Sequence, residues 1–354
     1  MSSPLETLVA TKVREIWGLK TRLVSLASLA GDASSRRYYR AFLAGEHVPD
    51  SLVVMQLAGS HLPISSEELA VFTQPLAELP FLNLHRFLHR LGVSVPGLYG
   101  QWPDDGILLL EDLGDASLWD SVQGLSFAAV LRYYEMAIDQ LLRIQILGTR
   151  ARDNSCMAFQ QRFDFRLYMW EFDHFLDYGF AGEKITAAER SLLKQSFTAI
   201  GQHLDSQSPF LNHRDYHSWN LMVRGGKIVV IDFQDALLAP LQYDLASLLN
   251  DRETDRVIGP NAEQRLLEYY LRRKDALEGT RTDRDEFYET YLFSALQRDF
   301  KVVGRFRFLD QVKGKPGYKK YIPATLRRIK RNLQRTGRFA NLIPVLAQHF
   351  SELR

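Results

Sequence analysis

The sequence feature that most constrains the fold is a polar segment followed at once by a tight hairpin. The segment reads His213-Arg214-Asp215-Tyr216-His217-Ser218-Trp219-Asn220. The following residues, up to Phe233, form two short apolar runs around Arg-Gly-Gly-Lys, a pattern that predicts a β-hairpin. A hairpin returns the chain to its starting point, so we expect Asp232 beside Asn220. If residues 213–220 form a loop, the side chain of Asp215 can face the same cavity as that of Asn220.

The same segment fits the pattern H-R-D-x-x-x-x-N, with an acidic residue at the end of the next strand. Phosphoryl transfer needs a carboxylate to orient the attacking hydroxyl and oxygen ligands to hold Mg²⁺ against the phosphates. Asp215 is the candidate catalytic carboxylate, and Asn220 and Asp232 are the candidate Mg²⁺ ligands. Each residue taken alone could instead cap a turn or end a strand. Their combination at this spacing favours the catalytic interpretation.

Two histidines in the segment allow an alternative. We interpret His213 as a residue that packs and hydrogen-bonds to hold the loop, rather than one that transfers a proton. His213 and His217 near three oxygen-bearing side chains are also compatible with a transition-metal hydrolase. Hard oxygen ligands dominate the segment and no further histidine cluster follows, which disfavours that alternative.

The chain changes character near residue 112. Its first part predicts strands over 21–29, 37–43, 52–57, 97–101 and 107–111, the first three as an antiparallel meander. A capping box at Ser65 and Glu68 predicts a helix that ends near Gly92. Later amphipathic stretches predict helices over 126–147, 159–178, 187–204, 262–276 and 284–304. We therefore predict an α+β fold, with a small antiparallel β lobe over 1–112, a larger helical catalytic lobe over 113–354, and residues 109–114 at a cleft between them.

Composition limits the class of protein. The 354 residues are 46% hydrophobic and 24% charged, which is ordinary for a globular chain. A single cysteine, Cys156, cannot form an internal disulfide, and no signal peptide opens the sequence, so we expect a cytoplasmic protein. The longest apolar runs, 107–110 and 228–231, are far shorter than the roughly 20 residues that span a bilayer, so we expect no membrane span.

The charge is unevenly distributed although its sum is only +2. Residues 297–338 contain 14 Lys or Arg and only two acidic residues. Three interpretations fit this segment: solvated faces of C-terminal helices, an anion-attracting rim, or a nucleic-acid patch.

The catalytic loop and the strand after it resemble the aminoglycoside phosphotransferase and choline kinase group, and the resemblance spans most of the chain. It implies a two-lobed, protein-kinase-like fold. Within the group the sequence most resembles the bacterial cell-wall amino-sugar kinases, which phosphorylate the anomeric hydroxyl of N-acetylmuramic acid and N-acetylglucosamine. The loop is specific to the superfamily, and the C-terminal matches favour the amino-sugar branch. The matching segments are 31–34, 109–114, 231–236, Pro240 with 243–245, 297–304, 314–316, and Pro323 with 326–327.

The resemblance implies an ATP-dependent, Mg²⁺-requiring kinase with Asp215 as the catalytic base. It makes Asn220 and Asp232 the metal ligands. Glu111 and Leu113 would lie on the hinge beside adenine, where backbone groups do the recognising. A small-molecule sugar would be the acceptor, and the oligomeric state is left open.

Further roles are implied for other positions. Asp235 and Arg298 are candidate substrate contacts, and Asp244 would be a structural acid behind the loop. The turn at 31–35 would hold phosphates through backbone N–H groups and the hydroxyls of Ser34 and Ser35.

The sequence also departs from the kinase pattern. A lysine is expected on the third strand, but Met55 or Gln56 stands there, so the phosphate-clamping ion pair is missing or supplied elsewhere. The turn at 31–35 lacks G-x-G-x-x-G, which leaves Arg36 or Arg37 as nearby cations. A pseudokinase is therefore an alternative, although the three catalytic acid and amide positions remain.

The sequence also leaves room for a different acceptor or a different class of protein. The acceptor could be an aminoglycoside, choline or another small alcohol, although cationic acceptors suit acidic pockets. A protein kinase is disfavoured because D-F-G and A-P-E segments are missing. A nucleic-acid-binding module is also disfavoured, since aromatic residues are sparse in the basic segment and the acidic constellation would have no role. That module would use Arg327, Arg328, Lys330, Arg331, Arg335 and Arg338.

Overall fold

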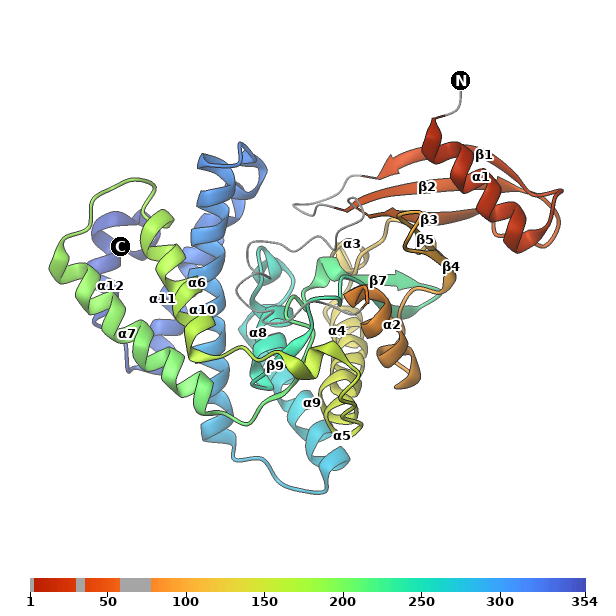
Figure 1. The fold of residues 1–354 in the computed structure, drawn as a ribbon. Coiled ribbons are helices and arrows are strands. Elements are labelled where there is room, and N and C mark those ends of the chain that lie inside the picture. The colour runs from red at the N-terminus through yellow and green to blue at the C-terminus, as the bar shows by residue number, and fades with distance from the viewer. Residues whose placement is uncertain (1–2, 30–35, 58–77) are drawn as a thin grey trace.

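A computed structural model describes residues 3–29, 36–57 and 78–354. The amino-terminal part is an antiparallel sheet in the order β1-β2-β3-β5-β4. Figure 1 shows this sheet at one end of the molecule, with helix α1 against it. The predicted turn at 31–35 and the capping box at Ser65 and Glu68 lie outside the described residues. The elements are α1 (Pro4–Trp17), β1 (Arg22–Leu29), β2 (Arg37–Ala44), β3 (Ser51–Gln56), α2 (Pro80–Arg90), β4 (Leu98–Trp102) and β5 (Ile107–Glu111).

The two faces of the sheet belong to different parts of the core. Leu52 and Val54 pack with Val9 and Val13 of α1, a helix that the sequence analysis does not predict. Met55 on β3 faces the other way and joins the large cluster that the helical part supplies. Because side chains alternate along a strand, even-numbered residues of β2 share that inner face. The inner face therefore lies toward the candidate catalytic segment, residues 213–233, whose Tyr216 and Phe233 belong to the same cluster.

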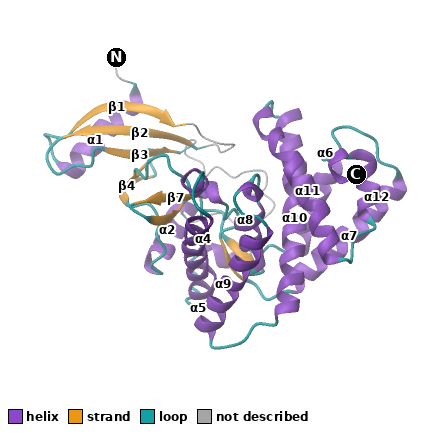
Figure 2. Ribbon diagram, turned by 180° about the vertical axis from the view of Figure 1, so that it is seen from behind, coloured by secondary structure: helices purple, strands orange, loops and turns teal. Residues whose placement is uncertain are grey.

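The rest of the chain is mainly helical, which confirms the α+β, kinase-like fold class (Figures 1 and 2). None of the described helices is long and apolar enough to cross a bilayer. One hydrophobic cluster joins residues on both sides of position 112, so the lobe boundary there stays a prediction. The helices are α3 (Leu118–Val122), α4 (Phe127–Leu142), α5 (Gly148–Arg150), α6 (Phe165–Tyr178), α7 (Ala187–Ser206), α8 (Gln242–Asn250), α9 (Pro260–Glu278), α10 (Arg284–Gln311), α11 (Ile322–Thr336) and α12 (Leu342–His349).

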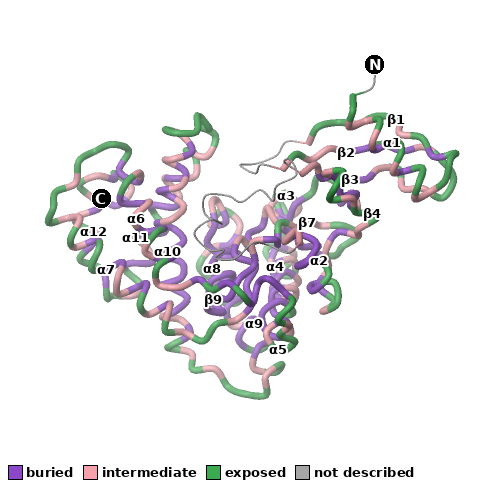
Figure 3. The backbone as a smooth tube through the Cα atoms, in the orientation of Figure 1, coloured by how far each residue is buried: buried purple, intermediate pink, exposed green. Residues whose placement is uncertain are grey.

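A small sheet that the sequence analysis does not predict brackets the catalytic segment. Strand β6 (Phe210–Asn212) pairs with β9 (Leu237–Ala239) in antiparallel register, with Leu211 opposite Leu238. Between them the predicted hairpin forms from β7 (Leu221–Arg224) and β8 (Lys227–Val230). The loop and the hairpin therefore begin after β6 and end before β9, two strands that are paired with each other. Burial is densest in this part of the molecule, around α4, α8 and α9 (Figure 3).

Helix α10 crosses α6 at Gly304. A Cβ atom placed on Gly304 would lie 2.8 Å from the Cα atom and 2.9 Å from the backbone nitrogen of Phe175. Backbone atoms of a packed helix cannot move aside as a flexible side chain can. Glycine is therefore required by the close approach of the two helices.

Gly304→Ala should lower the free energy of unfolding by about 1–3 kcal/mol, because overpacking forces the two helices apart. Denaturant midpoints of the variant and the wild type would measure this. Gly317→Ala is the matched control, since no atom lies within 4 Å of its added Cβ. Equal midpoints for both variants would contradict the close approach.

Candidate active site

A buried carboxylate holds the start of the catalytic loop. Asp244 lies in the first turn of α8 and is completely buried. Its two oxygens accept the backbone N–H groups of His213 at 2.5 Å and of Arg214 at 3.0 Å. Burial raises the pKa of Asp244 to about 6 against the effect of these donors. The acid that the sequence analysis expects behind the loop is thus bonded to the loop backbone.

Arg214 has a backbone conformation that a residue with a side chain rarely adopts, with φ of +81°. Such a conformation costs on the order of 1–3 kcal/mol and persists only when its surroundings fix it. Here Asp244 accepts the N–H of Arg214, and Arg298 Nη1 on α10 donates to its carbonyl oxygen at 2.8 Å. Both partners are buried. They fix the backbone direction at the residue before Asp215.

Asp215 is the partly exposed member of this group, with 42% of its side-chain surface open. Arg298 Nη2 lies 3.7 Å from its Oδ1 atom. The N–H of Asp215 donates to His213 Nδ1 at 3.3 Å, while His213 Nε2 lies 2.8 Å from the carbonyl oxygen of Ile231. A carbonyl oxygen only accepts, so Nε2 carries the proton and His213 is tied at both nitrogens. Its ring therefore holds the loop to the segment after β8 that carries Asp232.

The charges around Asp215 keep it ionised. Burial favours the neutral acid, but the nearby cations Lys301 and Arg298 outweigh it and hold the pKa of Asp215 below its ordinary value. Lys301 is itself fixed by Glu171 of α6, whose Oε1 atom lies 2.9 Å from Nζ. Gln297 donates to the other oxygen of Glu171 at 2.6 Å. The sequence analysis did not single out Lys301 or Glu171, because no local pattern reveals partners on two distant helices.

The hairpin brings the two candidate metal ligands together. The N–H of Ile231 donates to the carbonyl oxygen of Asn220 at 3.0 Å, which closes the hairpin. Asn220 Nδ2 donates to the carbonyl oxygen of Asp215 at 3.0 Å and lies 3.5 Å from Asp232 Oδ2. Since the amide nitrogen makes these contacts, the amide oxygen is the atom that could bind a cation. Asp232 has φ of +62°, a second left-handed residue at the site.

This donor set fits Mg²⁺. Burial raises the pKa of Asp232, and the negative charges of Asp235 and Asp215 raise it further, so a divalent cation would relieve this repulsion. Within the described parts of the chain, no three His, Cys, Asp or Glu side chains gather at a metal-binding distance. One carboxylate and one amide oxygen are a ligand set for Mg²⁺ that also uses substrate phosphates.

The two candidate substrate contacts differ in their surroundings. Gln234 Nε2 donates to Asp232 at 2.8 Å and to Asp235 at 3.3 Å, so Asp235 adjoins the candidate metal site. Arg298 is buried, and its guanidinium lies 5.0 Å from the ring centre of Tyr243. Arg298 thus contacts the catalytic loop and Tyr243.

The predicted hinge contains side chains with structural contacts. Glu111 accepts the N–H of Gly97 at 3.0 Å and lies 3.4 Å from Arg224 Nε, and Leu113 is nearly buried. Asp112, which lies between Glu111 and Leu113, binds Arg40 Nε of β2 at 2.7 Å. Arg40 also reaches Asp115 at 2.9 Å, so one arginine of the sheet clamps the connecting segment. The sequence analysis missed Arg40, whose partners lie more than 70 residues away.

The third strand lacks a lysine, as its sequence indicates. Met55 is buried in the apolar core, and Gln56 accepts the hydroxyl of Tyr39 at 3.2 Å. Tyr38, on the inner face, lies close enough to Asp232 and Asp235 that their charges add to the effect of burial, which raises its pKa. Its hydrogen bond with Arg36 acts in the opposite direction. Arg36 therefore lies on the same side as the candidate metal site, while Ser34 and Ser35 lie outside the described residues.

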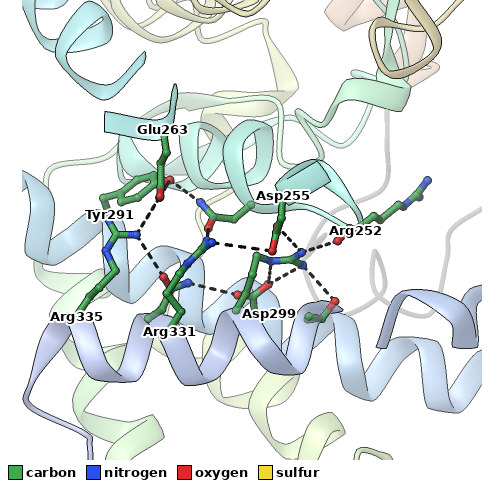
Figure 4. Close-up of polar contacts among 11 residues, drawn as sticks. Arg252, Asp255, Glu263, Tyr291, Asp299, Arg331 and Arg335 are labelled. Atoms are coloured by element: carbon green, nitrogen blue, oxygen red, sulfur yellow. Dashed lines mark hydrogen bonds and ion pairs between the residues drawn. The ribbon is translucent and has the colours of Figure 1, made fainter. Parts of the chain in front are cut away.

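Part of the basic C-terminal segment is paired within the protein. Arg328 is buried between Asp299 and Asp255, at 3.1 Å and 3.0 Å. Arg335 lies 3.0 Å from Glu263 on α9 (Figure 4). Solvated helix faces therefore account for only part of the charge of this segment, since Lys313, Lys319 and Arg327 are exposed. Arg338 likewise pairs with Glu289 at 2.6 Å.

The fold and site together define a protein-kinase-like phosphotransferase. The family model "Phosphotransferase enzyme family" matches residues 25–285, so the chain belongs to this family and is an enzyme that transfers phosphate to an alcohol acceptor.

Curated relatives cover most of the chain. The N-acetylmuramate/N-acetylglucosamine kinase of Neisseria meningitidis is 26% identical over 91% of this chain and 90% of its own. The protein of the same name from Caulobacter vibrioides is 29% identical over 84% of each chain. A choline/ethanolamine kinase family structure from Mesorhizobium loti aligns with a TM-score of 0.60 at 14% identity, covering 95% of this chain and 98% of the other. That likeness shows the fold.

His217 supplies a pH-dependent prediction. It is buried, with Nε2 3.8 Å from Asp251 Oδ2, and burial lowers its pKa from 6.5 to about 4. The unfolded chain therefore binds more protons than the folded protein between these values. The stability that neutral His217 contributes is present above pH 6.5 and is lost as the pH falls toward 4.

We expect His217→Gln to flatten the pH dependence of stability over this range. The wild type should lose a few kcal/mol relative to the variant between about pH 7 and about pH 4. Denaturant unfolding at several pH values would measure the difference. A constant difference across the range would show that His217 keeps an ordinary pKa in the folded protein.

Proposed function

We propose that this protein is an ATP- and Mg²⁺-dependent kinase that phosphorylates the anomeric hydroxyl of N-acetylmuramic acid or N-acetylglucosamine. The observation that carries the proposal is the convergence of Asp215, Asn220 and Asp232 in a chain whose curated relatives are N-acetylmuramate/N-acetylglucosamine kinases. The geometry supports phosphoryl transfer, and the relatives support the acceptor.

In this proposal Asp215 orients the acceptor hydroxyl and accepts its proton. An anomeric hydroxyl is more acidic than an ordinary sugar alcohol, so a base with a low pKa can accept its proton late, in a loose transition state. Asn220 and Asp232 would hold Mg²⁺, which when bound neutralises charge on the phosphates. The hinge at Glu111 and Leu113 would receive adenine through backbone groups.

The charges near Asp215 favour a neutral or anionic acceptor over a cationic one. Arg298 and Lys301 both act on the carboxylate of Asp215. An aminoglycoside with several ammonium groups would bring like charges against them. This observation disfavours an aminoglycoside as the acceptor.

Asp215→Asn keeps the size and nearly all the packing of the side chain but removes the carboxylate. Positioned proton transfer contributes about 10² to 10⁴ in rate, so kcat should fall by that factor while the melting temperature stays close to that of the wild type. Steady-state kinetics and thermal unfolding would measure both. Near-normal turnover in a folded variant would refute the role of Asp215.

A panel of acceptors with ATP and Mg²⁺ tests the acceptor. N-acetylmuramic acid or N-acetylglucosamine should be phosphorylated at C1, and glucose should react much more slowly, because a site built to hydrogen-bond an amide rejects analogues that lack it. A 1-O-methyl glycoside should be inert. Phosphorus-coupled NMR would identify the product. Rapid reaction of the methyl glycoside would show that another hydroxyl is attacked, and preference for kanamycin-like amines would favour an aminoglycoside kinase.

A further inference from the structure

One arginine beside the catalytic loop is held between aromatic rings. Arg252 follows α8, and its guanidinium lies 4.7 Å from the ring centre of Trp219 and 5.7 Å from that of Tyr321. In Figure 4 its side chain points away from the buried ion-pair network. The guanidinium makes no ion pair with any residue in the described ranges 3–29, 36–57 and 78–354. Its charge is therefore available to a ligand.

The backbone of Arg252 is fixed by that buried network. Its φ is +43°, a left-handed conformation that needs support from its surroundings. Arg328 on α11 donates from Nη1 to the carbonyl oxygen of Arg252. The same guanidinium is held by Asp299 and Asp255, and Arg331 donates to Asn250, the last residue of α8, at 3.1 Å. The network thus fixes the backbone from which the Arg252 side chain starts (Figure 4).

The neighbours of Arg252 place it next to the reacting groups. Trp219 immediately precedes Asn220 in the loop that carries Asp215. Trp219 also stacks on Trp119, with ring centres 4.7 Å apart. The electrostatic neighbours of His217 include both Arg252 and Asp215, so these two charges lie near one buried ring. An anionic group at Arg252 would therefore lie beside an acceptor bound at Asp215.

Two acidic residues flank Arg252 in the sequence, and neither forms an ion pair with it. Asp251 lies 3.8 Å from His217, although the charge of Arg252 also acts on it, and Glu253 lies 3.2 Å from Arg256 Nη1. A guanidinium is a planar fork that matches a carboxylate with two parallel hydrogen bonds, and stacking on aromatic faces fixes the direction of that fork. The chemistry of the position suits a carboxylate on the acceptor.

We propose that Arg252 binds a carboxylate carried by the acceptor and so makes the enzyme prefer an acidic amino sugar. The inference rests on the proposed function. N-acetylmuramic acid differs from N-acetylglucosamine by a lactyl ether on O3, which carries one carboxylate. In a pyranose ring C3 is separated from the anomeric carbon by a single atom. Arg252 would thus bind the lactyl carboxylate, the group that distinguishes the two sugars.

The test compares acceptors that differ only in charge. Wild-type enzyme should use N-acetylmuramic acid with a kcat/KM about 10-fold to 100-fold higher than that of its uncharged carboxamide, the range expected for hydrogen bonds to a charged group. Arg252→Gln should abolish this ratio chiefly through the KM of the acid, and Arg252→Lys should restore part of it. The KM for ATP should not follow the same pattern. Thermal unfolding would verify that the variants are folded.

Arg256→Gln is the matched control. Arg256 is four residues away, 68% exposed and paired with Glu253, and its variant should keep the wild-type ratio. An unchanged ratio in Arg252→Gln, or an equal loss on acid and amide, would overturn the role of Arg252. A change confined to the KM for ATP would instead assign the arginine to the nucleotide. Wild-type enzyme that phosphorylates neither sugar would refute the proposed function, and this inference with it.

Discussion

The catalytic loop depends on the way two buried side chains hold the backbone of one residue. Arg214 has a left-handed backbone, and Asp244 and Arg298 bind its N–H and C=O groups. Asp244 belongs to α8, directly after the β6–β9 ladder, while Arg298 belongs to α10. The direction of Asp215 therefore depends on helices that are far apart in the sequence. Loss of either partner would leave a strained residue and a buried backbone group without its hydrogen bond, which is a larger penalty than a lost surface contact.

Helix α10 connects the site to the rest of the helical part. Along its length Gln297 and Lys301 bind Glu171 of α6, Arg298 binds the loop, and Asp299 binds Arg328 of α11. Consecutive residues of a helix point in different directions, so neighbouring positions can serve three partners at once. Gly304 completes the arrangement by allowing the close approach of α6. This explains why residues 297–304 contain three charged side chains and are yet largely buried.

The features that could be predicted from the sequence are those encoded by local patterns. The loop and hairpin follow from turn residues and apolar runs, and the predicted strands and long helices follow from their periodicity. The three-residue strands β6 and β9 are too short to show a period. Arg40, Glu171 and Lys301 act through partners on distant elements. The left-handed backbone conformations at Arg214, Asp232 and Arg252 could not be predicted from the sequence either, because none of these positions is a glycine. Local sequence thus encodes the reacting groups, and tertiary contacts determine their orientation.

The charges around the catalytic loop are acidic on one side and basic on the other. On the hairpin side, Asp232 and Asp235 create a repulsion that a cation would relieve. On the side of α8 and α10, Arg298 and Lys301 stabilise the ionised form of Asp215, and the charge of Arg252 acts on His217. Burial keeps His217 neutral at physiological pH, so it adds no further positive charge near these cations. Asp215 thus lies between acidic residues that would bind a cation and basic residues that keep its carboxylate ionised. It can stay ionised while a neutral or acidic alcohol approaches.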